Sequence, residues 1–552
     1  MKCLIIRYLF ILVFFVAGFS LSFGQISYGG KPLTFSLEQV LAPHQITLSE
    51  IPVTELLQED EVEKVSGNPL RFSVSVKCHI DFSKDCEWYI VDNHKVGLLK
   101  IKAPVGFGML LYYSDFMIPD QGKLFIYTSE KKFLLGSYTS ATNPERGYFA
   151  TELVPSGELI IEYNSPASVD NPKIIIEETG IAYKPIMHSS DGFGGAGACE
   201  VNINCEEGSG FQDAKRALAR IIVKQGASSY WCTGSLLNNI RQDFTPYLLT
   251  ADHCGFTSTP QELGQWIFYF KYEGPECSNP LNDLEFNSYT MTGATKIAAA
   301  GKMGTDIRSD FKLLVLNESI PPSYNPYFLG WSIADTGSPF GVSLHHPQGD
   351  IMKISTYQTP LVSTAWANTP NTHWKVLWAE TPNGHGVTEG GSSGCPILDS
   401  EGRVIGQLTG GEATCNSPNL PDYYGQFRFS WDQIGDADST KLKPWLDPDN
   451  SGLTYLNGGW LGIDQFVKLP EKLELHPNPA NDHILLNNSQ LKNHIVILRL
   501  INSSGLSVKE LVCTFNDIGE YNLDLADTHR GLYFISLTAT HLSFSGKVLV
   551  IK

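Results

Sequence analysis

The sequence predicts an all-β protein of several domains, and three observations lead to that prediction. The chain of 552 residues is longer than one hydrophobic core supports, so three or four domains are expected. Short apolar runs recur along the chain, separated by turns rich in its 50 glycines and 31 prolines. A helix is expected only near residues 440–446, "TKLKPWL".

Residues 1–24 have the features of a signal peptide. Lys2 and Arg7 precede an apolar run that ends in small residues at Gly24. No later segment is apolar over the length of a transmembrane helix, so the mature chain is expected to lack one. The protein is therefore expected to be exported, with most of its 11 cysteines in disulfides.

The composition indicates a globular protein, with 42% hydrophobic and 18% charged residues. The formal net charge of -18 argues against a nucleic acid partner, because phosphate groups need a basic surface. The same acidity suits solubility and would also suit a cationic substrate.

Residues 25–191 are predicted to be a β-rich region, and they contain no recognisable motif of catalytic residues. Alternating runs such as "RFSVSVKCHIDF" and "GELIIEYNSP" predict strands. Cys78 and Cys86 are close enough in sequence to close a local hairpin.

Two further regions follow. Residues 192–460 are rich in glycine and cysteine, and their strand-like runs predict β-barrels. These runs are "RIIVKQG", "PYLLTADHC", "DFKLLVLN", "RVIGQLTGG" and "YYGQFRFSW". Residues 469–552 predict a small β module with its own turns, at "HPNPANDHILL", "INSSGLSVKE" and "HRGLYFISL".

Three short motifs in the middle region suggest nucleophilic catalysis. His253 ends an apolar strand in "YLLTADHCG", Asp310 precedes one in "SDFKLLVLN", and Ser393 lies in "GGSSGCP". A serine becomes a nucleophile when an imidazole takes its proton and a carboxylate orients that imidazole. A glycine before the serine lets backbone amides turn inward, so the N–H groups of Gly391 and Ser393 are the predicted oxyanion hole.

Each motif also has an ordinary interpretation. A histidine at a strand end is commonly a surface residue, and "GSSG" is a common turn. Their joint occurrence at strand junctions, in the order histidine, aspartate, serine, favours a serine protease. The alternative from another class is an inactive protease-fold protein used for binding or adhesion.

The stretch from Gly194 to about Leu456 resembles the lysyl endopeptidase branch of the chymotrypsin-like serine proteases. The resemblance lies in "GAGACEVNINCEEG", "WCTGSLLNN", "LLTADHCG", "SDFKLLVLN", "LGWSIAD", "SLHHPQGD", "GVTEGGSSGCPI", "VIGQLTGG", "DYYGQF" and "LKPWLDP". It implies a chymotrypsin-like double β-barrel with His253, Asp310 and Ser393 as the triad. Asp306 is the only nearby rival for the acid.

The resemblance also implies three disulfides: Cys199–Cys415, Cys205–Cys277 and Cys232–Cys254. A cross-link that closes a loop like the last one should stabilise the fold by roughly 3 kcal/mol. Cys395 stands where the family usually has a serine, and we expect it to be a buried free thiol.

Specificity for lysine is expected from Asp422. The trypsin-type position for the acid is occupied here by Val387, whereas the family supplies its acid from the later strand that contains "PDYYGQF". A buried carboxylate favours an ammonium partner, since an unpaired buried charge is costly. The alternatives are Asp422 as a turn residue, Glu389 as the acid, and a preference for arginine or another residue.

Trp366, in "TAWANTP", matches the family tryptophan that lies against the catalytic imidazole; otherwise it is a core or rim aromatic. The family pairs that tryptophan with a histidine, and the corresponding residue in "GQLTGG" is Thr409. No catalytic metal or other cofactor is expected, because the adjacent His345 and His346 should point to opposite faces of a strand.

The family resemblance further implies a long propeptide, here residues 25–191. Ser392 replaces the aspartate that binds the new N-terminus in trypsin, so latency should come from this region instead. The new terminus is expected between Ser189 and Gly194. Cleavage after Lys184 is not expected, because Pro185 follows it.

The last module resembles the C-terminal sorting domain of the type IX secretion system. The resemblance lies in "HPNPANDHI", the "SSG" turn, "HRGLYFISL" and the terminal "KVLVIK". It implies that the secretion machinery is a partner and that the protein crosses the periplasm and outer membrane. We expect a monomer, secreted or attached to the cell surface, that acts on protein or peptide substrates.

Overall fold

The computed structural model describes residues 27–64, 69–145, 147–185, 195–280, 289–302, 306–461, 473–488, 491–502, 507–539 and 542–551. These residues form two compact units, one within residues 1–461 and one within residues 462–552. The expected signal peptide and the expected processing site between Ser189 and Gly194 lie outside the described residues.

The N-terminal region, up to residue 185, contains two β-layers around an apolar core. One sheet has the order β1-β4-β9-β6-β7, with β3 paired to β4, and the other layer has the order β2-β10-β5-β8. Its core includes Leu99, Phe116 and Ile126. The strands are β1 (His44–Thr47), β2 (Leu70–Asp81), β3 (Glu87–Val91), β4 (His94–Lys102), β5 (Gly108–Met117), β6 (Lys123–Tyr127), β7 (Leu134–Tyr138), β8 (Phe149–Ala150), β9 (Glu158–Pro166) and β10 (Lys173–Ala182).

Two short helices interrupt this β-rich region. Helix α1 (Val53–Lys64) was not predicted, because "VTELLQEDEVEK" has no continuous apolar stripe. It is held by the buried Asp60, whose carboxylate accepts a 2.8 Å hydrogen bond from Arg71 on β2. Helix α2 (Phe82–Asp85) separates β2 from β3.

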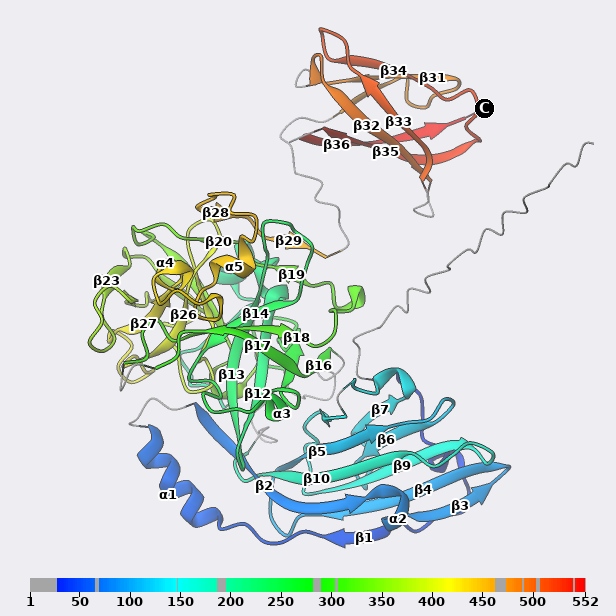
Figure 1. Cartoon of the computed structure of the whole chain (residues 1–552), viewed down its shortest axis with the longest axis vertical. Helices are drawn as coiled ribbons and strands as arrows, with labels where there is room; N and C mark the ends of the chain where they lie inside the picture. The colour runs from blue at the N-terminus through cyan, green and yellow to red at the C-terminus, as the bar shows by residue number, and fades with distance from the viewer. Residues whose placement is uncertain are drawn as a thin grey trace, which may run out of the picture. The chain divides into compact units, whose positions relative to one another are not determined.

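Strand β2 joins the N-terminal region and the middle of the chain in one sheet. It pairs antiparallel with β13 (Ser228–Leu237), so that Leu70 lies opposite Trp231. An apolar cluster crosses this joint, where the ring of Phe72 stacks on Trp231 at a centroid distance of 4.2 Å. Figure 1 shows β2 in blue and β13 in green. The two regions that were expected as separate domains therefore lie in one compact unit.

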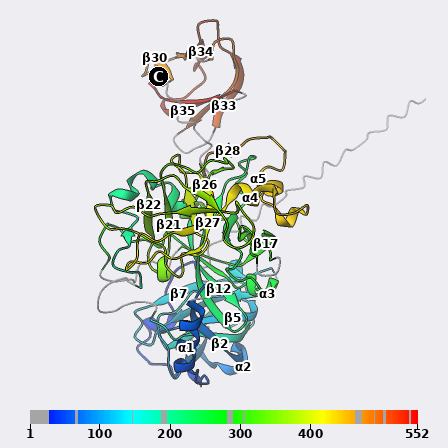
Figure 2. The same cartoon turned by 90° about the vertical axis from the view of Figure 1, so that its left-hand side faces the viewer.

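Residues 195–461 form two antiparallel sheets, and the predicted all-β double barrel is confirmed. The first has the order β16-β15-β12-β13-β14-β18-β17. The second has the order β11-β22-β21-β25-β26-β27-β24-β23, and several of its strands face the viewer in Figure 2. The first sheet contains β12 (Leu218–Gln225), β14 (Tyr247–Ala251), β15 (Ile267–Phe270), β16 (Thr290–Thr292), β17 (Ala294–Ala299) and β18 (Phe311–Leu316) besides β13. The second contains β11 (Val201–Asn202), β21 (Gly341–His345), β22 (Lys353–Tyr357), β23 (Val362–Thr364), β24 (His373–Val376), β25 (Pro396–Leu398), β26 (Val404–Gly411) and β27 (Asp422–Gln426).

Short elements complete this unit. Strand β20 (Trp331–Ser332) pairs with β26 and with β28 (Tyr455–Leu456), and β19 (Tyr327–Phe328) pairs with β29 (Gly459–Trp460). Helix α3 (Pro260–Leu263) follows the histidine loop.

The helix prediction near residues 440–446 is confirmed only in part, since α5 spans Lys443–Leu446 after a short turn. The strand prediction for "YYGQFRFSW" is wrong in its second half. Residues there form α4 (Phe427–Asp432) because Phe427, Ser430 and Trp431 recur at helical spacing and are all buried.

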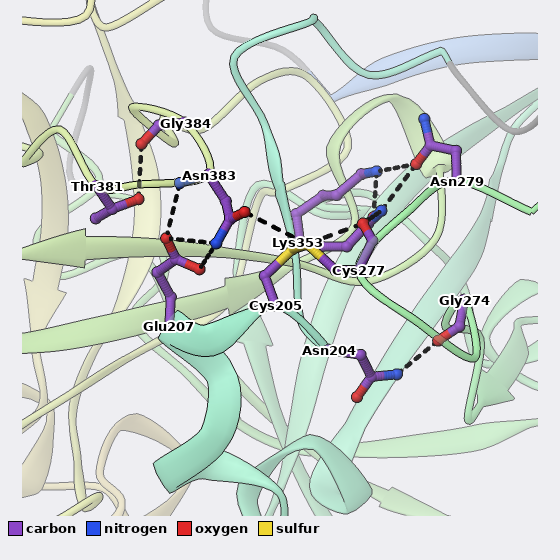
Figure 3. Close-up of a disulfide and its surroundings, with 11 residues drawn as sticks. Asn204, Cys205, Glu207, Gly274, Cys277, Asn279, Lys353, Thr381, Asn383 and Gly384 are labelled. Atoms are coloured by element: carbon purple, nitrogen blue, oxygen red, sulfur yellow. Dashed lines mark hydrogen bonds between the residues drawn. A yellow bond between two sulfur atoms is a disulfide. The ribbon is translucent and has the colours of Figure 1, made fainter.

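The three disulfides that the family resemblance implied are present: Cys199–Cys415, Cys205–Cys277 and Cys232–Cys254. Figure 3 shows Cys205–Cys277 among side chains that bind neighbouring loops. The Asn204 amide donates a 2.6 Å hydrogen bond to the Gly274 carbonyl, and the Asn383 amide donates to Glu207 at 3.0 Å. The disulfide and these hydrogen bonds together fix the loops beside β11 and β22.

The suggested Cys78–Cys86 bridge is wrong, because both thiols are free. Cys78 lies on β2 and donates toward the Ile176 carbonyl of β10, whereas Cys86 follows α2 and packs into the core. Helix α2 thus places the two sulfur atoms in different surroundings. Cys395 is free and buried, as predicted.

The C-terminal unit is a small β-sandwich, as predicted. Its sheets have the orders β30-β31-β34 and β33-β32-β35-β36. Buried side chains such as Ile484, Leu498 and Ile535 form its core. The strands are β30 (Glu474–His476), β31 (His483–Asn487), β32 (Ile495–Asn502), β33 (Ser507–Thr514), β34 (Glu520–Asp524), β35 (Gly531–Ala539) and β36 (Leu542–Val550).

The apolar joint predicts that Phe72→Ala destabilises the unit formed by residues up to 461. Loss of a buried phenylalanine stacked on Trp231 should lower the free energy of unfolding by about 3–5 kcal/mol. Denaturant unfolding of the full chain measures this, with Phe107→Ala as the matched control because Phe107 is 52% exposed. Equal losses in the two variants would contradict a joint held by Phe72.

Candidate active site

His253 is held in a loop that follows strand β14. The disulfide from the next residue, Cys254, ties this loop to β13. The buried Lys312 ammonium donates to the carbonyls of Asp252, Cys254 and Gly255 at 3.0, 2.6 and 2.9 Å. Burial lowers the pKa of Lys312 to about 8. The imidazole therefore sits on a fixed backbone.

Asp310 orients this imidazole from the start of β18. Its Oδ2 lies 2.6 Å from His253 Nδ1, and its Oδ1 accepts the backbone N–H of His253 at 2.9 Å. The Asp310 carboxylate is fully buried, and its backbone has a φ of 55°. With Nδ1–H donated to this carboxylate, Nε2 carries the lone pair that can accept a proton.

The rival acid, Asp306, does not bind this imidazole in the structure. Its Oδ1 accepts the N–H of Arg308 at 2.8 Å, and its Oδ2 accepts the Thr369 hydroxyl. Among the three sequence candidates, His253 and Asp310 are thus directly hydrogen-bonded.

Ser393 lies on the loop beside the histidine. The N–H of Thr233 donates to the Ser393 carbonyl at 2.9 Å, and Cys254 Sγ lies 3.7 Å from the same oxygen. Within the described residues, His253 Nε2 is buried and has no hydrogen-bond partner. The structure therefore brings the serine to the histidine loop without a hydrogen bond between their reactive atoms.

Two peptide groups around Ser393 have their direction fixed by hydrogen bonds to their carbonyls. The Gly390 carbonyl accepts from Gln348 N at 2.6 Å, and the Ser392 carbonyl accepts from Cys395 N at 2.9 Å. Since the C=O and N–H of one trans peptide point in opposite directions, the N–H groups of Gly391 and Ser393 point away from these partners. Gly391 has a φ of 98°, which a residue with a side chain rarely adopts. Neither of these two N–H groups donates to a backbone carbonyl within the described residues, and their role as an oxyanion hole stays a prediction.

Asp422 is a fully buried carboxylate on strand β27, so its interpretation as a turn residue is wrong. Its Oδ2 accepts from Trp378 Nε1 and from the Thr388 hydroxyl, both at 2.7 Å, and Oδ1 accepts from Ala413 N at 3.2 Å. All three donors are neutral. Burial raises the pKa of Asp422 to about 6.

Glu389, the alternative acid, binds the protein backbone. Its Oε2 accepts the N–H of Gly197 at 3.1 Å, which ties the loop before Ser393 to the segment that begins at Gly195. Burial raises its pKa. Val387 is fully buried and apolar, so no acid occupies the trypsin-type position.

Trp366 packs against a histidine that the sequence did not suggest. Its ring lies 5.9 Å from that of His373, and His373 Nε2 lies 3.0 Å from the Thr409 hydroxyl. Burial lowers the pKa of His373 to about 4, against the opposite influence of Asp310 and Asp306. Strand β24 thus places an imidazole between Trp366 and Thr409. A direct contact between Trp366 and His253 is not among the contacts of the described residues.

Sequence reasoning missed Lys312 and His373. Lys312 lies two residues after Asp310, and an ammonium in the middle of the apolar run "FKLLVL" was the available signal. His373 had no such signal, because its neighbours come from the pairing of β24 with β27.

His345 is the last residue of β21 and His346 follows the strand, and the two side chains bind different partners. His345 Nδ1 lies 2.8 Å from the Ser392 hydroxyl, and His346 Nδ1 lies 2.9 Å from the Asp350 carbonyl. The described part of the chain contains no group of three or more metal-binding side chains. It likewise contains no helix with the length and apolar character that a bilayer crossing needs.

Two family models match the chain. Residues 193–425 match the lysyl endopeptidase C-terminal domain, and residues 474–552 match the secretion system C-terminal sorting domain. A lysyl endopeptidase of Pseudomonas aeruginosa is 29% identical over 256 residues, which are 44% of this chain and 52% of that protein. The chain therefore spans about half the length of this curated relative.

Two solved structures also align with part of the chain. An inactive mutant form of Rv3671c from M. tuberculosis H37Rv has a TM-score of 0.23 at 15% identity, over 38% of this chain and 82% of that one. A Glu endopeptidase in complex with MPD has a TM-score of 0.24 at 17% identity, over 38% of this chain and 85% of that one. With the family matches, the segments quoted from the sequence identify residues 193–425 as a lysyl endopeptidase-like domain and residues 474–552 as a C-terminal sorting domain.

Proposed function

We propose that this protein is a serine endopeptidase that cleaves peptide bonds after lysine. The main support is the 2.6 Å contact between His253 Nδ1 and Asp310 Oδ2, next to a loop in which the N–H groups of Gly391 and Ser393 point away from the partners of the preceding carbonyls. The family match of residues 193–425 supports the same activity.

In this mechanism His253 Nε2 takes the proton from Ser393 Oγ while Oγ attacks the carbonyl carbon of the substrate. The carbonyl electron pair moves to its oxygen, which the N–H groups of Gly391 and Ser393 stabilise; one such donor contributes about 10²–10³-fold in rate. Breaking of the C–N bond releases the amine, which receives the proton from His253, and leaves an acyl-enzyme. Water then attacks with His253 as base, and Ser393 regains its proton. Asp310 holds the imidazole in the required tautomer throughout.

Asp422 would recognise the lysine side chain. A buried carboxylate with three neutral donors and no cation among its described partners is incompletely compensated. An ammonium from the substrate would complete it, whereas a glutamate side chain would be repelled.

A mixed peptide digest tests both parts of this proposal. Wild-type protein, after removal of the N-terminal region, should cleave mainly after lysine. Asp422→Asn should lower kcat/KM for lysyl bonds by roughly 10³-fold, because the ammonium loses its charged partner, while phosphonofluoridate still labels Ser393. Ser393→Ala should lose about 10⁶-fold in kcat and all labelling.

Unchanged lysine preference in Asp422→Asn would remove Asp422 from the specificity site. Absence of both hydrolysis and labelling in correctly processed wild-type protein would favour the inactive binding protein instead.

The raised pKa of Asp422 predicts pH-dependent binding of a cation. Below about pH 6 the carboxyl becomes protonated and neutral, so the affinity for a protonated amine should fall about tenfold per pH unit. Calorimetry of n-butylamine binding to Ser393→Ala protein between pH 4.5 and 8 measures this without turnover. The Asp422→Asn variant should bind weakly at every pH; a pH-independent wild-type affinity would contradict the assignment.

We also infer that residues 25–191 are a propeptide that keeps the site latent. Strand β2 pairs with the part of β13 next to Ser393. Leu70 of β2 packs against Gly390: a Cβ added to Gly390 would lie 3.3 Å from the Cβ of Leu70. An extended peptide that approached Ser393 along this edge would have to displace β2. Arg71 ties the start of β2 to helix α1 through ion pairs of 2.8 Å to Asp60 and 2.9 Å to Glu59.

Latency predicts that the unprocessed chain hydrolyses a protein substrate slowly and that Leu70→Asp relieves this. A carboxylate against the Gly390 backbone should loosen the end of β2, so initial rates should rise about tenfold before any cleavage of the chain. Leu57→Asp is the matched control, because Leu57 is 43% exposed in the same region. Equal rates for unprocessed and processed wild-type protein would rule out a latent form.

The C-terminal unit would direct export. The sorting-domain match of residues 474–552 supports passage through the type IX machinery to a secreted or cell-surface location. This unit then has no part in peptide hydrolysis.

A further inference from the structure

A chain of hydrogen bonds links the loop before Ser393 to strands β21 and β22. The Ser392 hydroxyl lies 2.8 Å from His345 Nδ1, and His345 Nε2 lies 2.9 Å from the Ser355 hydroxyl. Ser355 Oγ donates in turn to the Val387 carbonyl at 2.7 Å, and the Glu389 N–H donates to Ser392 Oγ at 3.3 Å. This series of hydrogen bonds therefore starts at Ser392 and ends at Val387, on the same loop.

The direction of every hydrogen bond in the chain follows from its fixed end. A carbonyl only accepts, so Ser355 uses its proton on Val387 and must accept from His345 Nε2–H. A neutral imidazole that donates from Nε2 accepts at Nδ1, so the Ser392 hydroxyl donates to it. Ser392 Oγ is then left to accept from the Glu389 N–H.

The surroundings keep His345 neutral. The side chains of His345, Ser355 and Ser392 are fully buried. Burial lowers the pKa of His345 to about 3, and the neighbouring His346 and Lys353 act in the same direction. Glu200 Oε2 lies 3.8 Å from His345 Nε2, and burial raises the pKa of this carboxyl well above its usual range. One tautomer of His345 is therefore fixed over the range in which proteases work.

We propose that His345 is a positioning residue for the oxyanion hole. It fixes Ser392, whose two flanking peptides carry the N–H group of Ser393 on one side and the carbonyl of Gly391 on the other. The Gly391 carbonyl is itself held by the Thr233 hydroxyl at 3.0 Å. In trypsin an ion pair with the new N-terminus orders this loop, but residue 392 is serine here and cannot form that pair. The neutral, buried His345 orders the loop instead. This inference rests on the proposed hydrolysis of peptide bonds.

Kinetics of processed His345→Leu and Ser392→Ala proteins test the proposal. Each variant should lower kcat by about 10²-fold, because the donors are misplaced for the developing negative charge. KM and the affinity for n-butylamine should stay within twofold, since Asp422 is untouched. The double variant should be no slower than the slower single variant, because either change breaks the same chain.

His346→Gln is the matched control. His346 is equally buried and adjacent in sequence, but its Nδ1 binds the Asp350 carbonyl outside the chain. Its kcat should stay within threefold of wild type. A His345→Leu protein with wild-type kcat, or losses that multiply in the double variant, would overturn the proposal. Wild-type protein without hydrolysis would instead overturn the proposed function.

If His345→Leu fails to fold, nitrogen-15 NMR of the intact, phosphonate-blocked protein decides. The expected spectrum shows His345 with its proton on Nε2 at every pH from 5 to 9. Titration of His345 in that range, or a proton on Nδ1, would overturn the proposal without any variant.

Discussion

The direction of two carbonyl groups determines the rest of the candidate site. Gly390 and Ser392 each have their C=O bound by a backbone N–H, so the N–H groups of Gly391 and Ser393 point away from these donors. Glycine at 391 is needed for this path, because its φ is 98° and a Cβ there would lie 2.9 Å from the Gly349 nitrogen. The side chains of this loop then have little freedom: Ser392 turns inward and Ser393 is left at the surface of the loop.

Buried charge is handled differently on the two sides of the site. On the histidine side, Lys312 is surrounded by three carbonyls and lies 3.6 Å from the Asp252 carboxylate, so its charge is compensated within the fold. On the other side, Asp422 has only neutral donors among the described residues. The arrangement around Lys312 stabilises a loop. The negative charge of Asp422 is left without a cationic partner, which a cationic ligand can supply. The contrast between them is a physical reason to place recognition at Asp422.

The sequence predicted those parts of the site that depend on local motifs. His253, Asp310 and Ser393 each stand at a strand end, where a short motif determines the backbone and a single side chain carries the chemistry. His373 depends instead on the register between β24, β26 and β27, which no local pattern contains. The same holds for the β2–β13 pairing: "RFSVSVKCHIDF" predicts a strand but not its partner in a distant part of the chain. Cys78 and Cys86 were misjudged for a related reason, since their spacing did not reveal the helical turn between them.

The pairing of β2 with β13, where Leu70 lies opposite Trp231, has a consequence for how the protein would respond to proteolytic cleavage. While the backbone is continuous, β2 meets β13 as part of the same molecule, at an effective concentration on the order of millimolar. After cleavage on the C-terminal side of Pro185, the last described residue of the N-terminal region, the β2–β13 contact joins two separate molecules. The fraction of protein in which this contact is made then falls with dilution. Release from a confined compartment into a large volume would then complete what the cut began. The switch would be set by volume as much as by proteolysis.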